Sequence, residues 1–214
     1  MTGAAAGTMA KVAATLGRRA RGRKPSRGGA HDIPSLWLMT DPARTPDPAA
    51  LAARLPRGSG VIYRTFGAAD AAQVAMRLRA ITRARGVRLL IAADWPLAAR
   101  VGADGVHLPQ RMMSQAPGLH RRRPGWLVTA SAHDLAAIVA GTRWSLDALF
   151  VSAVFASRSP SAAAPLGPLR FEALARRSGV PVIALAGIDD TTAPRLRISH
   201  ASGLAAVEAF AVRT

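Results

Sequence analysis

The feature that most constrains the fold is a regular alternation of short apolar segments with amphipathic ones along residues 35–209. Each apolar segment has the length and the nearly continuous hydrophobicity of a strand that is buried on both faces. The pattern therefore predicts strands over residues 35–40, 61–66, 87–92, 105–108, 126–132, 148–155, 181–186 and 203–209.

The segments between these strands carry apolar residues at helical spacing. They predict helices over residues 48–55, 68–85, 96–101, 134–144, 168–177 and 191–201, and a shorter, weaker helix over 113–120. Strands that alternate with helices indicate a parallel sheet covered by helices. Eight strands in about 175 residues predict an α/β fold, a compact (β/α)8 TIM barrel below the usual size of about 250 residues. A doubly wound open sheet is the alternative.

Residues 1–34 differ from the rest, being rich in Ala, Gly and Arg with no clear buried strand. We predict a basic, disordered N-terminal arm with no essential role, followed by a barrel domain over residues 35–214. The chain ends a few residues past the eighth strand. The last outer helix is therefore expected to be missing, truncated or supplied by another element such as the N-terminal arm. An exposed flank of this kind would favour a homodimer.

Composition excludes several classes of function. No cysteine is present, so disulfides and thiolate sites are ruled out. No apolar run approaches the roughly 20 residues of a membrane span, and we expect a soluble, cytoplasmic protein without a membrane partner. The formal net charge is +17, but most basic residues are Arg and no aromatic-rich basic stripe accompanies them. Specific nucleic-acid binding is therefore not expected.

Residues that directly follow the strands of such a barrel share one rim, where active sites of this fold are built. Here that rim carries hydroxyl, carboxylate, amide, imidazole and guanidinium groups, which suit a small anionic ligand. They are Thr40, Asp41, Arg64, Asp94, Gln110, Ser131, His133, Ser157, Arg158, Ser159, Gly187 and Glu208.

Three of these residues have a functional and a structural interpretation. As a histidine, His133 can accept and release a proton during catalysis, or it is a bystander beside a helix cap at Asp134. Gly187 lets backbone N–H groups approach a phosphate, or it forms an ordinary turn. Asp94 can bind a magnesium ion only with a further acidic or phosphate ligand, so capping of the next helix is the better interpretation.

Several segments resemble, in order and spacing, the thiamine phosphate synthase and TenI family. They are Leu90-Ile-Ala-Ala-Asp-Trp95, Gly102-Ala-Asp-Gly-Val-His-Leu-Pro-Gln110, Ser131-Ala-His133, Ala153-Val-Phe155 and Pro181-Val-Ile-Ala-Leu-Ala-Gly-Ile188. The resemblance runs from about Leu36 to Phe210. It implies a (β/α)8 barrel that binds a thiazole phosphate at its rim. Synthase members join that ligand to a pyrimidine pyrophosphate with magnesium, whereas TenI members tautomerise a thiazole phosphate carboxylate by proton transfer.

This chain departs from the synthase pattern where charge is needed. Residues 62–66 keep Arg64 but lose the family's amide and lysine, and Ala93 replaces the asparagine before Asp94. Met112 stands at the position of a metal-binding aspartate, and Ser157-Arg-Ser-Pro160 lacks the family's lysine. A departing pyrophosphate requires such charges.

The phosphate-binding positions also depart from the family. The usual Gly-Gly is Ala186-Gly187, and Glu208 replaces a serine after the eighth strand. A carboxylate repels a phosphate unless a cation such as Arg158 intervenes.

The sequence therefore predicts a TenI-like tautomerase without a metal or other cofactor, in which His133 is catalytic. The predicted ligand is a small phosphorylated thiazole, held by Arg64, Gln110, Ser131, Ser157, Arg158, Ser159 and the backbone of Gly187. One alternative is a diverged synthase, an enzyme of the transferase class that would use Mg²⁺ with Asp94. A second alternative is a barrel that binds a ligand without catalysis.

Overall fold

A computed structural model describes residues 7–22, 32–158 and 164–210. Eight parallel strands follow one another around a closed barrel, and β1 pairs with β8 to complete it. The strands are β1 (Leu36–Met39), β2 (Gly60–Tyr63), β3 (Arg88–Ala92), β4 (Gly105–Leu108), β5 (Leu127–Ala132), β6 (Ala148–Val151), β7 (Val182–Leu185) and β8 (Gly203–Ala206). The predicted barrel is confirmed, and the open sheet is excluded.

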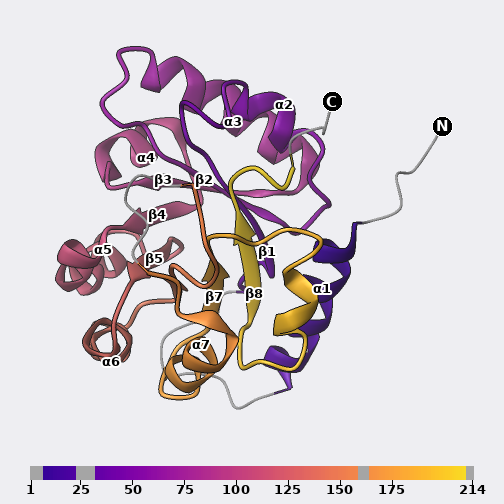
Figure 1. The fold of residues 1–214 in the computed structure, drawn as a ribbon. Coiled ribbons are helices and arrows are strands. Elements are labelled where there is room, and N and C mark those ends of the chain that lie inside the picture. The colour runs from indigo at the N-terminus through magenta and orange to yellow at the C-terminus, as the bar shows by residue number, and fades with distance from the viewer. Residues whose placement is uncertain (1–6, 23–31, 159–163, 211–214) are drawn as a thin grey trace.

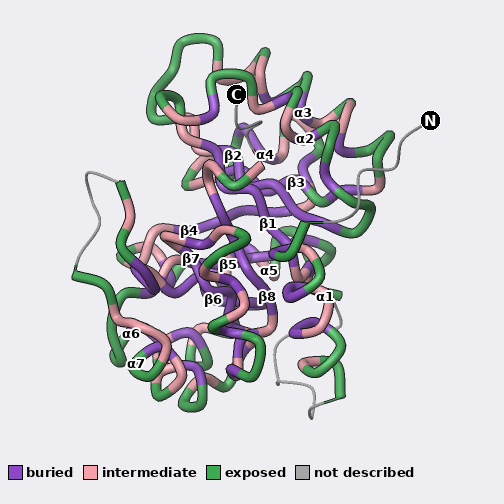
Figure 2. The backbone as a smooth tube through the Cα atoms, turned by 45° about the vertical axis from the view of Figure 1, so that its right-hand side comes forward, coloured by how far each residue is buried: buried purple, intermediate pink, exposed green. Residues whose placement is uncertain are grey.

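The barrel interior is filled by large side chains from facing strands. Trp37 of β1 and Phe150 of β6 are fully buried and meet edge to face, with ring centroids 5.3 Å apart. Gly60 of β2 makes room for Trp37, because a Cβ there would lie 2.2 Å from the indole ring. A second apolar layer lies between the strands and the outer helices. Figure 2 shows the buried strands at the centre and exposed residues on the outer helices and loops.

Helices cover the outside of the barrel (Figure 1). They are α1 (Thr8–Arg21), α2 (Pro48–Ala52), α3 (Ala71–Arg85), α4 (Trp95–Val101), α5 (Ala116–Arg122), α6 (Leu135–Arg143) and α7 (Gly167–Ala175), with 3₁₀ helices η1 (Gln110–Gln115) and η2 (Ala193–Leu196). Only η2 occupies the helix predicted over 191–201. The main-chain N–H and hydroxyl of Ser199 both donate to the carbonyl of Leu196, which closes a turn and ends the helix there.

The prediction of a disordered arm is wrong for residues 8–21, which form α1. Met9, Val12, Ala13 and Leu16 recur at helical spacing and are buried, because α1 packs against η2, β8 and β1. Figure 1 shows α1 beside the C-terminal part of the chain that contains η2 and β8. Within the described residues no helix follows β8. The alternative that the arm supplies the missing outer helix is confirmed.

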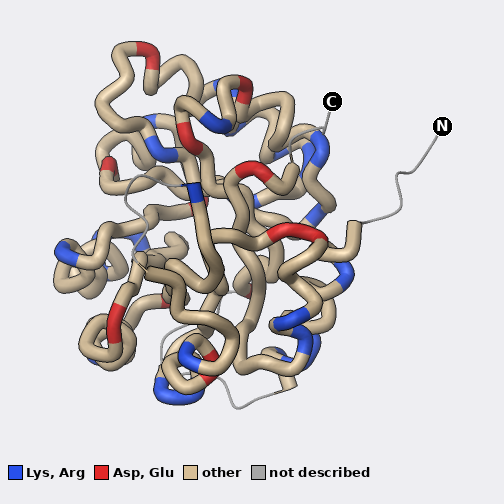
Figure 3. Tube along the Cα trace, viewed as in Figure 1, with Lys and Arg blue, Asp and Glu red and all other residues tan. Residues whose placement is uncertain are grey.

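Charged residues lie on the outer helices and loops. Figure 3 shows Lys and Arg on several sides of the molecule, interspersed with Asp and Glu. Among the residues that the structure describes, no helix combines the length and hydrophobicity needed to cross a bilayer.

Candidate functional site

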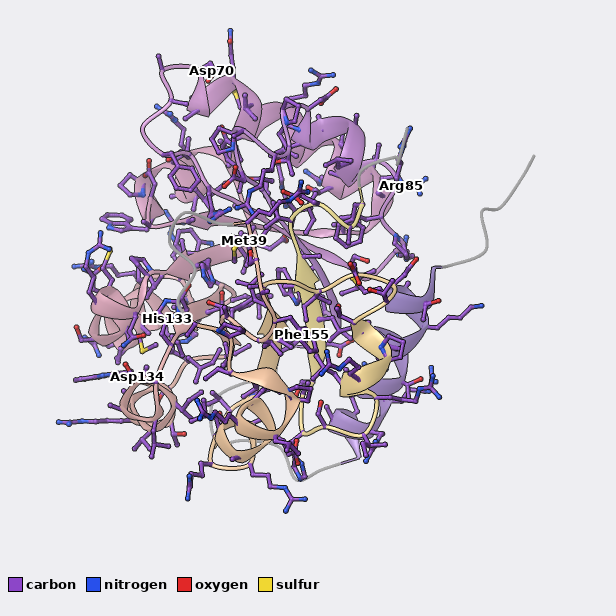
Figure 4. All side chains as sticks on the ribbon, in the orientation of Figure 1. Met39, Asp70, Arg85, His133, Asp134 and Phe155 are labelled. Carbon is purple, nitrogen blue, oxygen red and sulfur yellow. The ribbon has the colours of Figure 1, made fainter. Side chains whose placement is uncertain are left out.

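A cavity of about 1660 Å³ opens at the carboxyl ends of the strands. Of the predicted site residues, it brings together Arg64, Ser131, His133, Ser157, Arg158 and Gly187, and Glu208 also lines it. Figure 4 shows Met39, His133 and Phe155 in the central part of the molecule, whereas Asp70 and Arg85 lie away from it around α3. Gln110 and Asp94 do not line this cavity, and Ser159 lies outside the described residues.

His107 lines the cavity and was not predicted from the sequence. It points into the barrel from β4, where its ring nitrogens lie 2.9 Å from the hydroxyls of Thr129 and Ser131. Burial lowers the pKa of His107 to about 3, with a smaller contribution from the charge of Arg64, so its imidazole is neutral at pH 7. Strand alternation was the available signal, because Val106 and Leu108 face outward to the helices.

His133 follows β5 and is exposed at the edge of the cavity. Its Nδ1 lies 3.1 Å from the carbonyl oxygen of Ser152 and 3.2 Å from the Ser152 hydroxyl. In the tautomer whose Nδ1–H donates to that carbonyl, Nε2 carries a free electron pair. The geometry therefore allows His133 to accept a proton from a bound ligand.

Gln110 supports the His133 loop from outside the cavity. Its Oε1 accepts from the main-chain N–H of His133 at 3.0 Å, and its Nε2 donates to Asp134 at 3.0 Å. Asp134 caps α6 by accepting from Ala137, and this bond, followed by the one from Gln110, lowers the pKa of Asp134. The structure therefore gives Gln110 contacts that position His133, and the predicted ligand contact stays untested.

The donor set at the rim does not fit a magnesium ion. Asp94 accepts a hydrogen bond from the main-chain N–H of Leu97 at 2.8 Å and so caps α4, as predicted from the sequence. The side chain of Met112 offers no oxygen ligand. Across residues 7–22, 32–158 and 164–210, no group of three His, Asp or Glu side chains is placed to hold a metal.

A network of ion pairs lies at the rim beside the ends of β1 and β2. Asp41 pairs with Arg44 at 2.8 Å and with Arg64 at 3.1 Å. The hydrogen bond from Arg44 is the main cause that lowers the pKa of Asp41. Arg64 also donates through Nε to the carbonyl of Thr40 at 2.6 Å, and burial lowers the pKa of Arg64. These contacts hold Arg64 in place where it lines the cavity.

Glu208 meets two cations across the cavity mouth. Arg158 forms an ion pair with one of its oxygens, and Nε of Arg44 lies 3.8 Å from the other. The cation expected beside this carboxylate is therefore present. Arg44 was missed because it lies in the loop after β1, four residues past the strand-end threonine, and only the closed barrel brings that loop to the end of β8.

Gly187 forms the floor of the cavity after β7. Its φ is +65°, and an added Cβ would lie 2.4 Å from the carbonyl oxygen of Ala156 and 2.7 Å from Cβ of Phe155. Only glycine combines this conformation with so close an approach. The hydroxyl of Thr192 donates to the carbonyl of Gly187 at 2.8 Å. This turn therefore brings bare backbone to the cavity.

The chain is similar in sequence to a family of known proteins. Residues 37–210 match the family model described as thiamine monophosphate synthase. The thiamine-phosphate synthase of Chloroflexus aurantiacus is 34% identical over 166 residues, covering 75% of this chain and 76% of that protein. The thiamine-phosphate synthase of Methylococcus capsulatus is 34% identical over 197 residues, covering 86% and 82%.

A solved structure, thiamine phosphate pyrophosphorylase from Pyrococcus furiosus, shares the fold. Its TM-score is 0.70 at 19% identity, and the match covers 82% of this chain and 86% of that one. Together with the family match over residues 37–210, the resemblance noted in the sequence is confirmed. This chain belongs to the thiamine monophosphate synthase family.

Proposed function

We propose that this chain joins a thiazole phosphate to a pyrimidine pyrophosphate and releases pyrophosphate. The names of the relatives support this synthase reaction over the tautomerase predicted from the sequence. The observation that carries the proposal is the arginine content of the cavity, which can balance a highly charged leaving group. Its lining includes Arg44, Arg64, Arg111, Arg158 and Arg195.

In the proposed reaction, the bond between the pyrimidine-bearing carbon and a pyrophosphate oxygen breaks, and the electron pair leaves with the pyrophosphate. The ring nitrogen of the thiazole then donates its electron pair to the resulting carbocation. In this proposal, Arg64 and Arg158, which line the cavity, stabilise the negative charge that develops on the leaving group. His107 and Ser131 offer neutral hydrogen-bonding groups deeper in the barrel, where charge would be costly.

Synthases of this family pair this reaction with magnesium, but the rim of this chain lacks a matching set of oxygen ligands, as shown above for Asp94 and Met112. Guanidinium groups can stabilise phosphate oxygens by bidentate hydrogen bonds without an ordered metal site. In this proposal, the arginines of the cavity stabilise the charge of the leaving group.

A second candidate is the tautomerase reaction, which the position of His133 favours. In the tautomer whose Nδ1–H donates to the carbonyl of Ser152, His133 can take a proton from the ligand at Nε2 and return it at another atom. This reaction needs no pyrimidine pyrophosphate and releases no pyrophosphate. A barrel that binds the thiazole phosphate without turnover remains the third outcome.

The test uses the purified full chain in two assays. Pyrophosphate release is measured with both substrates, in magnesium and in excess chelator, and isomerisation is measured with the thiazole phosphate carboxylate alone. The synthase proposal expects pyrophosphate release that Arg64→Ala lowers at least tenfold, since charged hydrogen bonds contribute about 1.5–3 kcal/mol. Arg100→Ala is the matched control, because Arg100 is exposed on α4 outside the cavity.

The outcomes separate the candidates. Pyrophosphate release that persists in chelator supports the arginine-based synthase, and strict dependence on magnesium overturns the assignment of charge stabilisation to arginine alone. Isomerisation without pyrophosphate release, abolished by His133→Gln, favours the tautomerase. Ligand binding without either product overturns both reactions.

A further inference from the structure

Arg195 of the cavity stacks on an aromatic ring, as Arg64 does on Phe66, but Arg64 also pairs with Asp41. Arg195 lies in η2, and its guanidinium carbon is 4.9 Å from the ring centroid of Phe155. A guanidinium that stacks on an aromatic face keeps its N–H groups along its edge available for hydrogen bonds. Arg195 and Phe155 both line the cavity. The stack therefore presents an oriented set of donors to a ligand.

The charge of Arg195 is not neutralised by a protein carboxylate. Arg44, Arg64 and Arg158 each form an ion pair with Asp41 or Glu208. In the part of the chain that the structure describes, no carboxylate oxygen lies within 4.0 Å of a nitrogen of Arg195. Its positive charge is therefore available to an anionic ligand.

The two acids nearest in sequence are engaged elsewhere. Oδ1 of Asp189 accepts from the main-chain N–H groups and hydroxyls of Thr191 and Thr192. Oδ1 of Asp190 accepts from the main-chain N–H of Met9, at the N-terminus of α1, at 2.7 Å. Both carboxylates thus serve to build the loop after β7 and to dock α1.

Arg195 borders the same corner of the cavity as Gly187. An added Cβ at Gly187 would lie 2.7 Å from Cβ of Phe155, and the N–H of Phe155 donates to the carbonyl of Ala186 at 3.1 Å. The backbone at Gly187 therefore lies directly beside Phe155, on whose ring Arg195 stacks. One anionic group can contact both the turn and the guanidinium.

We propose that Arg195 binds the phosphate of the thiazole ligand and sets the preference of this site for a phosphorylated ligand over its free alcohol. The inference rests on the proposed function, since it assumes that a thiazole phosphate is the ligand. It assigns the phosphate to the Gly187 and Phe155 side of the cavity. Arg44 and Arg158, which pair with Glu208, are not assigned the principal role in binding the phosphate.

The experiment compares two ligands on four forms of the full-length protein. Calorimetry measures the Kd of the thiazole phosphate and of the unphosphorylated thiazole alcohol for wild type, Arg195→Ala, Arg195→Lys and Arg197→Ala. Arg197 is the matched control, because it is an exposed arginine two residues away that does not line the cavity. Thermal unfolding of each variant checks that the fold is intact.

Arg195→Ala is expected to weaken the thiazole phosphate about 10- to 100-fold, the loss of a charged hydrogen bond, and to leave the alcohol unchanged. Arg195→Lys keeps the positive charge but loses the planar guanidinium that stacks on Phe155. Its affinity for the thiazole phosphate should therefore fall between those of wild type and Arg195→Ala. Arg197→Ala should match wild type for both ligands.

Two results would overturn the inference in different ways. Equal affinity of Arg195→Ala and wild type for the thiazole phosphate would remove Arg195 from the phosphate site and leave the proposed function standing. Failure of wild type to bind either ligand would overturn the proposed function, and the inference with it.

Discussion

Leu16 tests whether α1 is an integral part of the barrel. Its side chain is 0% exposed and lies on the face of α1 that packs against η2, β8 and β1. Replacing Leu16 with Ala removes buried apolar groups and leaves a cavity, because α1 is held on one side by rigid strands. Substitutions of this kind cost about 3 kcal/mol or more in free energy of unfolding.

The loss is large enough to measure by two methods. For a chain of this size, each kcal/mol lowers the unfolding midpoint by about 2–4 °C, so Leu16→Ala should unfold about 6–12 °C below wild type. Urea denaturation followed by circular dichroism gives the free energy directly. Lys11→Ala is the control, because Lys11 is exposed on the same helix and an exposed substitution changes stability by about 0.5 kcal/mol or less.

Equal stability of Leu16→Ala and Lys11→Ala would refute this reasoning. It would mean that α1 detaches at low cost before the barrel unfolds, since a local opening limits how far a substitution in the detached part lowers global stability. The barrel would then be stable with β8 and β1 uncovered.

Two further predictions concern the rim. His107→Asn should flatten the dependence of the free energy of unfolding on pH. In wild type, His107 binds a proton below about pH 6.5 in the unfolded chain but only below about pH 3 in the folded chain. Wild type therefore loses up to about 1.4 kcal/mol of this free energy per pH unit as the pH falls through this window. Urea denaturation at pH 6.5 and 5 checks it, and an unchanged slope would contradict a buried neutral His107. Glu208→Gln should tighten binding of the thiazole phosphate about two- to fivefold, since it frees Arg44 and the largely exposed Arg158 from a competing carboxylate. Calorimetry measures this change, and weaker binding would show that Glu208 helps to hold the ligand.

Much of the site was predictable because strand ends in a parallel barrel share one rim. Arg64, His133 and Gly187 follow their strands in the sequence, Ser131 lies near the end of β5, and all four meet in the cavity. Other residues were not predictable in the same way. Whether Gln110 faces a ligand or supports the His133 loop depends on the conformation of η1.

The arginines around the cavity show the same limit. Arg44 lies in the loop after β1 and Arg195 in the 3₁₀ helix η2, so neither directly follows a strand. Their roles depend on which side chains approach them: Asp41 and Glu208 for Arg44, and the Phe155 ring for Arg195. In a chain this rich in arginine, residue type alone does not distinguish a cavity cation from a surface one.

The sequence by itself determined the barrel, because strand and helix periodicities are local and repeat with a regular order along residues 35–209. It also determined the family, through segments such as Gly102-Ala-Asp-Gly-Val-His-Leu108. Only the tertiary structure decided that α1 covers β8 and β1, since this requires contact between the two ends of the chain. The charge balance of the rim was likewise decided there, because ion pairs depend on distances in space and Glu208 meets Arg44 and Arg158 only in the closed barrel.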